Sequence, residues 1–232
     1  IKNPLTPIQL SAERLKRKYS KEISTEPEIF EQCTDTIIRQ VRDLRQMVDE
    51  FSSFARMPSP IIKTEDLVDI TKKATFLMDV GSNNIKISTD FPDHKVEFEC
   101  DARQIGQALT NIIKNATEAL IEQENAQIEI SLVADENMTS IIVTDNGIGM
   151  PEAILDRLTE PYVTTRAKGT GLGLAIVKKI MKDHGGDLVL ENNKGAGATS
   201  KLVFKNSSNS EVNYDIEDDL QSESKIRIVH GA

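Results

Sequence analysis

The first 57 residues contain no glycine and carry proline only at Pro4, Pro7 and Pro27. Glycine is the most flexible residue and proline breaks helix interiors, so this stretch favours long helices. In its second half, apolar residues recur every seven positions, at Phe30, Ile37, Leu44 and Phe51. This heptad spacing predicts one apolar seam along a long helix.

A weaker apolar stripe runs through the first half, at Leu5, Ile8, Ala12 and Leu15. Between the halves, Thr25 and Glu28 have the spacing of a capping box, and Pro27 is tolerated in a first helical turn. Residues 1–57 are therefore expected to form a helical hairpin. Two helices bury little surface, so we expect the seam to pack against a second copy in a dimeric four-helix bundle. The alternative is that the seam packs on the chain's own second domain.

Pro58-Ser59-Pro60 cannot continue a helix and predicts a short linker at 58–60. Residues 61–205 contain stretches with the apolar periodicity of helices and stretches with the alternation of strands. Helices are expected at 64–80, 101–122 and 171–183, and strands at 85–89, 96–100, 128–133, 140–144, 188–191 and 199–204. The middle helix places Ile105, Leu109, Ile112 and Ile113 on its inner face. Because no regular βαβ repeat occurs, an α+β fold with helices on one face of a sheet is favoured.

The net charge of −9 argues against nucleic acid as a partner, because phosphate backbones are bound by basic patches. No apolar run approaches the length of a membrane helix. Two buried thiols are favoured for Cys33 and Cys100 over a disulfide. Residues 206–232 are acidic and are expected to be disordered, with a single strand at 225–229 as the alternative. The sequence starts at Ile1 inside a motif, so we expect it to be part of a longer protein.

Glycines cluster at three places in the second region, at 147–149, 169–173 and 195–197. Glycine there permits positive φ angles and close backbone approach, and the middle cluster opens a helix whose free N–H groups and dipole can hold phosphate. Neither a P-loop nor a dinucleotide-binding fingerprint is present. A different type of phosphate site is therefore implied.

The segments 111–119, 145–150, 160–165 and 169–174 resemble, in order, the N, G1, F and G2 boxes of sensor histidine kinases, and 195–199 resembles the closing G3 element. Asn3-Pro4-Leu5 is similar to the end of the family's H-box, His-Glu-x-x-Asn-Pro-Leu. The string through Leu15 resembles the NtrY-type nitrogen-regulation kinases in particular. The resemblance covers residues 1 to about 205 and implies an α/β-sandwich ATP-binding domain after the hairpin.

The resemblance assigns roles to single residues. Asp145 would accept a hydrogen bond from the adenine amino group, and Gly149 would let the base approach the backbone. Asn115 would bind Mg²⁺ through its amide oxygen. Asn111, one turn earlier on the same helix face, and Lys114 would contact phosphate oxygens as catalytic residues. An Asp-Asn-Gly turn with a purely structural role is the alternative for Asp145.

A lid over the γ-phosphate is implied around Arg166, Lys168 and Thr170. For Arg166 and Lys168 the alternative is that they are ordinary solvated charges. The residues expected to contact ATP are Asn111, Asn115, Asp145, Gly147, Gly149, Met150, Thr164, Thr165, Arg166, Lys168, Gly169, Thr170, Gly171, Leu172, Gly173 and Thr199.

Related ATPases of the gyrase and Hsp90 group carry a glutamate where this chain has Asn111. An amide is not a general base, so slow ATP hydrolysis is expected and the γ-phosphate is left for a histidine. That histidine would lie two residues before Ile1, outside this sequence. Asn3 matches a position that orients water for phosphatase activity in similar kinases, or else it caps the helix. His184 is expected to cap a helix C-terminus.

The implied function is autophosphorylation of a histidine followed by transfer to the aspartate of a response regulator, which for an NtrY-like kinase would be of the NtrX type. The expected partners are therefore a second copy and a receiver domain, with no nucleic acid. We expect the chain to be the cytoplasmic portion of a sensor that is anchored in the inner membrane through other regions. Two alternatives are a related ATP hydrolase and a dimerisation or phosphatase module.

Overall fold

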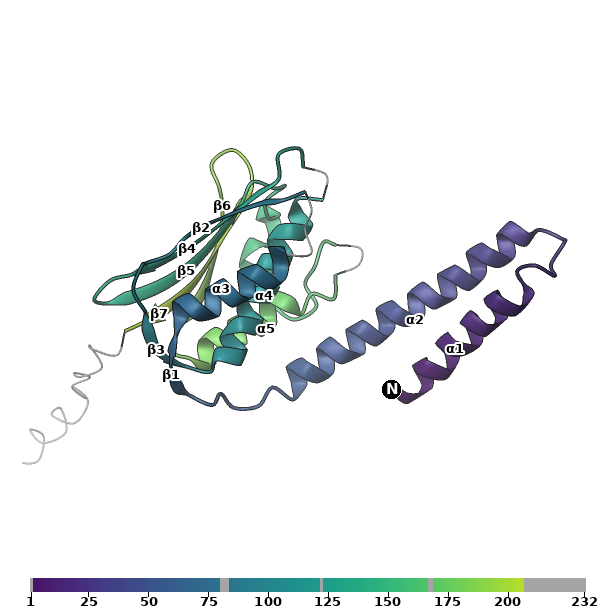
Figure 1. Ribbon diagram of the computed structural model, residues 1–232, viewed down its shortest axis with the longest axis horizontal. Helices are drawn as coiled ribbons and strands as arrows, with labels where there is room; N and C mark the ends of the chain where they lie inside the picture. The colour runs from purple at the N-terminus through teal and green to yellow at the C-terminus, as the bar shows by residue number, and fades with distance from the viewer. Residues whose placement is uncertain (1, 80–83, 122, 167–168, 207–232) are drawn as a thin grey trace, which may run out of the picture.

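The computed structural model describes residues 2–79, 84–121, 123–166 and 169–206, and it places a helical hairpin beside an α/β sandwich (Figure 1). The helices are α1 Lys2–Tyr19, α2 Pro27–Ala55, α3 Leu67–Asp79, α4 Ala102–Ala119 and α5 Gly173–Asp183, with a 3₁₀ helix η1 Glu152–Arg157. The strands are β1 Lys63–Asp66, β2 Lys86–Asp90, β3 Glu97–Cys100, β4 Gln127–Ala134, β5 Met138–Asp145, β6 Asp187–Asn192 and β7 Ala198–Lys205. None of the described helices is long and apolar enough to cross a membrane.

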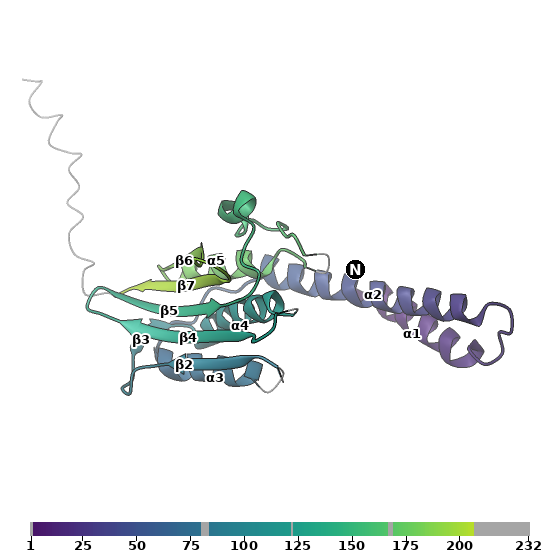
Figure 2. The ribbon, with the colours of Figure 1, turned by 90° about the horizontal axis from the view of Figure 1, so that it is seen from above.

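Five strands form the main sheet in the order β2-β4-β5-β7-β6, in which β2 and β4 are parallel and the other neighbours are antiparallel. Helices α3, α4 and α5 cover one face of this sheet (Figure 2). The α+β class and the one-sided cover expected from the sequence are therefore confirmed. Strands β1 and β3 form a separate antiparallel pair.

The core lies between the sheet and α4. Ile105, Leu109, Ile112 and Ile113 are each at most 1% exposed, as their spacing predicted. They face alternate residues of β4, β5 and β7, among which Ile128, Ile130, Ile141, Leu202 and Phe204 are fully buried. Full burial of one such side chain contributes about 1.5–3 kcal/mol, so this interface fixes α4 against the sheet.

The N-terminus of α4 is joined to the linker region before β1. The Asp101 carboxylate caps the helix by accepting from the N–H groups of Arg103 and Gln104, and it also accepts from the linker N–H of Ile61 at 3.0 Å. Burial acts to raise the pKa of Asp101, but these hydrogen bonds and one from the Arg103 guanidinium outweigh it, and the pKa is lowered. Gln104 Nε2 donates to the Pro58 carbonyl at 2.9 Å, so the linker is tied to α4.

His184 is the C-terminal cap of α5, as the sequence predicted. Its ring also bridges two helices, because Nδ1 lies 2.8 Å from the Ile180 carbonyl and Nε2 accepts from the Asp101 N–H at 3.0 Å. The end of α5 is thus joined to the start of α4. This second role was not expected from the sequence.

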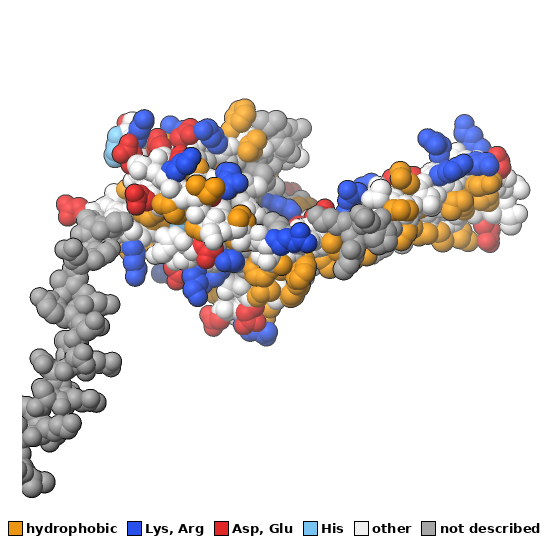
Figure 3. All heavy atoms as spheres, turned by 90° about the horizontal axis from the view of Figure 1, so that it is seen from below, with side chains coloured by type: hydrophobic (Ala, Val, Ile, Leu, Met, Phe, Trp, Pro, Cys, Tyr) orange, Lys and Arg blue, Asp and Glu red, His pale blue; other side chains and the backbone are white. Residues whose placement is uncertain are grey.

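The hairpin of α1 and α2 is confirmed, and its helices pack through Leu5, Ala12, Thr34 and Val41. Much of the predicted seam stays half-exposed: Ile37, Leu44 and Phe51 are 44–47% accessible. Hydrophobic side chains run along one side of the hairpin in Figure 3. That a second copy of the chain covers these side chains remains a prediction.

Among the described residues, the alternative partner for the seam, the chain's own second domain, is contacted at the end of α2 and just after it. There Phe54 and Met57 pack against the sandwich core, and the rings of Phe51 and Tyr162 stack with centroids 6.5 Å apart.

Four local expectations were wrong. Residues 64–66 form strand β1 and not the start of a helix, because they pair with β3. The capping box at Thr25 and Glu28 is not formed, since Glu26 is the N-cap with a left-handed φ of 52° and no side-chain bond, although Pro27 does begin the helix. Helix α5 starts at Gly173 because Gly171 has a φ of +67°.

The fourth concerns the cysteines. Cys100 is fully buried, and burial raises its pKa to about 11, but Cys33 is exposed and both thiols are free. The acidic stretch 207–232, including the possible strand at 225–229, lies outside the described residues.

We expect His184→Ala to lower the free energy of unfolding by about 1–3 kcal/mol, because the buried Asp101 N–H loses its acceptor. Urea denaturation followed by circular dichroism measures this loss. His94→Ala is the matched control: His94 is exposed, and its removal should change stability by less than about 0.5 kcal/mol. Equal losses for the two variants would show that the bridge to Asp101 contributes nothing.

Candidate nucleotide site

The candidate site lies at one end of the sandwich, where α4, α5 and three loops meet. The glycine clusters predicted from the sequence fall in these loops, after β5, before α5 and between β6 and β7. Their glycines are required for close packing. A Cβ on Gly197 would lie 1.9 Å from the Asp145 carbonyl oxygen, and one on Gly147 would lie 2.5 Å from the Ala119 carbonyl oxygen.

Asp145, the last residue of β5, is 7% exposed. Its Oδ1 accepts from the N–H of Gly147 at 2.9 Å and of Ala198 at 3.3 Å, and no described residue donates to Oδ2. Burial raises its pKa, and these two hydrogen bonds and the charge of Arg166 only partly offset that effect. The carboxylate is therefore held in a fixed orientation with one oxygen free to accept.

Two asparagines that the sequence did not single out hold the loops beside Asp145. The Asn192 side chain accepts from the Met150 N–H at 2.7 Å and donates to the Met150 carbonyl at 2.8 Å. Asn193 donates to the Asp145 carbonyl at 3.1 Å and accepts from Thr199, whose hydroxyl also lies 3.1 Å from that of Thr144. The only sequence signal was their place in a turn before Gly195. Gly149 lies in the loop after β5, next to Met150, and has a φ of +74°, a left-handed conformation that glycine adopts without strain.

Helix α4 carries the polar residues on the face that its sequence spacing predicts. Asn111, Lys114, Asn115 and Glu118 are spaced by three or four residues and therefore lie along one side. Asn111 Nδ2 donates to the Gly173 carbonyl at 3.4 Å, which ties α4 to the start of α5. Lys114 Nζ lies 3.9 Å from Glu118 Oε1. Glu118 was not expected to have a role.

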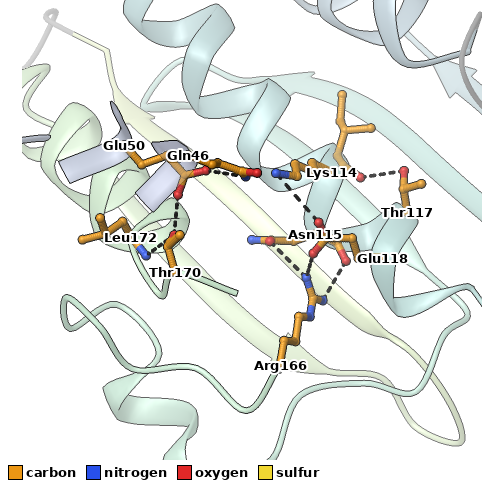
Figure 4. A network of polar contacts seen from close by, with 10 residues as sticks. Gln46, Glu50, Lys114, Asn115, Thr117, Glu118, Arg166, Thr170 and Leu172 are labelled. Atoms are coloured by element: carbon orange, nitrogen blue, oxygen red, sulfur yellow. Dashed lines mark hydrogen bonds and ion pairs between the residues drawn. The ribbon is translucent and has the colours of Figure 1, made fainter. Parts of the chain in front are cut away.

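Arg166 reaches from its loop to this face of α4 (Figure 4). Its Nη1 donates to Asn115 Oδ1 at 3.3 Å and forms an ion pair with Glu118 Oε2, and its Nη2 donates to the Asn115 carbonyl at 2.9 Å. One cationic nitrogen thus contacts an amide oxygen and a carboxylate oxygen together. An amide oxygen is one of the hard donors that Mg²⁺ accepts, so Asn115 fits the ion expected there.

Contacts with Thr164 and with helix α2 hold the segment before α5. Thr164 accepts from the Arg166 N–H at 3.1 Å, and a Cβ on Gly169 would lie 2.6 Å from the Thr164 hydroxyl. Thr170 donates to Glu50 of α2, which in turn accepts from Gln46 at 2.9 Å. The hairpin residues Glu50 and Gln46 could not be found from the sequence, because they lie more than a hundred residues away.

Not every expected contact residue faces the site. The side chain of Leu172 is fully buried in the core, which leaves only its main chain for a ligand, and Thr165 is exposed without a described partner. Gly171 packs under Tyr162. Lys168 lies outside the described residues, as does the side chain of Asn3 in α1. Gly173 begins α5, whose N-cap has no side-chain bond, so the first N–H groups are available to an anion.

Comparisons with known proteins agree with this geometry. The model of the His Kinase A (phospho-acceptor) domain matches residues 1–60, and that of the histidine kinase-, DNA gyrase B- and HSP90-like ATPases matches residues 100–208. The nitrogen regulation protein NtrY of Azorhizobium caulinodans is 50% identical over 213 residues, which are 88% of this chain and 27% of that protein. A putative NtrY-like sensor histidine kinase of Rickettsia prowazekii is 42% identical over 88% of this chain and 34% of its own length.

Solved structures give the same fold. Full-length ShkA in complex with AMPPNP aligns with a TM-score of 0.68 and 21% identity over 88% of this chain and 43% of that one. The catalytic domain of the histidine kinase ThkA aligns with a TM-score of 0.57 and 28% identity over 62% of this chain and 97% of that one. The chain spans about a third or less of the first curated relatives. It belongs to the sensor histidine kinase family, and within that family it is similar to the NtrY-type kinases.

Proposed function

We propose that the chain is the core of an ATP-dependent sensor histidine kinase that uses Mg²⁺. The observation that carries this proposal is the fixed, buried carboxylate of Asp145, to whose Oδ2 no described residue donates. Oδ2 would accept from the adenine amino group, and guanine would present an oxygen there instead. The site would therefore select adenine.

The phosphates would lie between α4 and the start of α5. Asn115 would hold the metal ion, and Asn111, Lys114 and the free N–H groups of α5 would contact phosphate oxygens. When bound, Mg²⁺ supplies positive charge that neutralises the triphosphate. Positioning and charge neutralisation are what phosphoryl transfer chiefly requires.

Asn111 favours a kinase over a hydrolase. Its side-chain amide, which donates to the Gly173 carbonyl, is not basic and cannot remove a proton from water. Transfer to a histidine on the hairpin is then the productive use of ATP, and Asn3 would serve any phosphatase activity.

We further propose that the hairpin at 1–57 pairs with a second copy, that residues 58–60 join it to the ATP-binding domain at 61–205, and that a receiver domain of the NtrX type accepts the phosphoryl group. The half-exposed seam of α2 supports the first point. The relatives' name, NtrY, supports the last, together with a solved complex of ThkA with the response regulator TrrA. On the same basis we propose that the chain is the cytoplasmic part of a longer protein whose membrane anchor lies in other regions.

We expect Asp145→Asn to weaken binding of a fluorescent ATP analogue at least about tenfold, because the amide presents an N–H group to the adenine amino group and a charge-assisted hydrogen bond is lost. Fluorescence anisotropy at saturating Mg²⁺ measures the affinity. Asp135→Asn, in the exposed β4–β5 turn where Asp135 accepts from Asn137 and Met138, is the matched control and should bind normally. Unchanged affinity for Asp145→Asn would refute the adenine role.

The same substitution should stabilise the fold in a pH-dependent way. The pKa of Asp145 is raised by burial, so the folded state binds this proton more tightly than the unfolded state. Stability is therefore lost as pH rises from the ordinary aspartate value of about 4 through the raised pKa. The Tm of Asp145→Asn minus that of wild type should grow between pH 4 and pH 7. A flat difference would contradict the raised pKa.

The kinase proposal is tested by adding the dipeptide His-Glu before Ile1. With γ-labelled ATP and Mg²⁺ this extended chain should take up acid-labile, alkali-stable phosphate at least about tenfold above a chain extended with Ala-Glu. Removing Mg²⁺ with EDTA should abolish the label. Steady phosphate release by both extended chains, without labelling of either, would support the hydrolase instead.

A further inference from the structure

Arg166 and a metal ion would compete for the same oxygen, Asn115 Oδ1. The guanidinium lies at the C-terminal end of α4, where helix carbonyls carry partial negative charge. Its Nη1 donates to Asn115 Oδ1 and pairs with Glu118 Oε2, so a cation bound to Asn115 Oδ1 would collide with Nη1 (Figure 4). Both cannot be there together.

The backbone around Arg166 favours this inward position. Its N–H donates to the Thr164 hydroxyl at 3.1 Å, and its carbonyl accepts from the Gly169 N–H at 3.1 Å. The side chain is 38% exposed and that of Glu118 is 35% exposed, so the ion pair is screened in part by water. Such a contact is weak enough to be exchanged for a ligand.

Glu118 would keep a positively charged neighbour after Mg²⁺ displaces Arg166. Lys114 Nζ lies 3.9 Å from its other carboxylate oxygen, Oε1, while Arg166 uses Oε2. The carboxylate therefore keeps a positive neighbour when Arg166 leaves, which lowers the cost of release.

We infer that Glu118 is a positioning residue that holds Arg166 across the cation site of the nucleotide-free protein, and that Mg²⁺ bound with nucleotide displaces the arginine from Asn115 and Glu118. The inference rests on the proposed function, because it takes Asn115 as the residue that holds Mg²⁺. The displaced guanidinium becomes free to contact phosphate. The Mg²⁺ concentration needed for nucleotide binding is then set in part by the Arg166–Glu118 ion pair.

The first test titrates free Mg²⁺ against binding of a fluorescent ADP analogue. Glu118→Gln weakens the competing arginine, so its half-saturating Mg²⁺ concentration should fall about two- to fivefold, the range for a partly exposed ion pair. Glu191→Gln is the matched control: it breaks a cross-strand ion pair with Lys201 of 2.9 Å and should leave the midpoint unchanged. A higher midpoint for Glu118→Gln would make Glu118 a metal ligand, and that result or an unchanged midpoint overturns the inference.

The second test needs no nucleotide. Trypsin must bind the arginine side chain to cut after it, so the ion pair protects the bond after Arg166. Glu118→Gln should speed this cut about two- to fivefold, as followed by mass spectrometry, and Glu191→Gln should not. Equal rates overturn the role of Glu118. By contrast, a wild-type chain that binds no nucleotide at any Mg²⁺ concentration would refute the ATP site itself.

Discussion

The packing of α4 against the sheet is the interaction on which the rest of the structure depends. Its inner face is fully buried, and its outer face carries Asn111, Lys114, Asn115 and Glu118. Because both faces belong to one rigid helix, the apolar residues that stabilise the core also fix the spacing of the polar ones. A rotation of the helix that moved Asn115 would expose Ile112 or Ile113, and burial of each contributes about 1.5–3 kcal/mol.

The two ends of α4 also position neighbouring segments of the chain. At the N-terminus, Asp101 and Gln104 bind the linker, and the Asp101 N–H donates to His184, the C-cap of α5. Near the C-terminus, the Ala119 carbonyl accepts from the Ile148 N–H at 3.3 Å and packs against Gly147. The loop that follows Asp145 is thus placed by the same helix that places Asn115.

Features that depend on local periodicity could be predicted from the sequence, and those that depend on distant contacts could not. The hairpin, the inner face of α4 and most strands follow from spacing alone. Residues 64–66 were mistaken for helix because only pairing with β3 makes them a strand. In the site, the glycine clusters and Asp145 could be found from their motifs. Glu118, Asn192 and Glu50 could not, because their roles arise from partners far away in the sequence.

The contacts between α2 and the loop before α5 link the two halves of the chain. Thr170 binds Glu50, and Tyr162, held at a positive φ of 68°, stacks on Phe51. The main chain of Tyr162 also receives support from Gly171, whose carbonyl accepts its N–H at 3.0 Å. The loop that carries Arg166 between these two contacts is therefore attached to the hairpin at both ends. A shift of α2 would therefore act on the segment that carries Arg166 through both Tyr162 and Thr170.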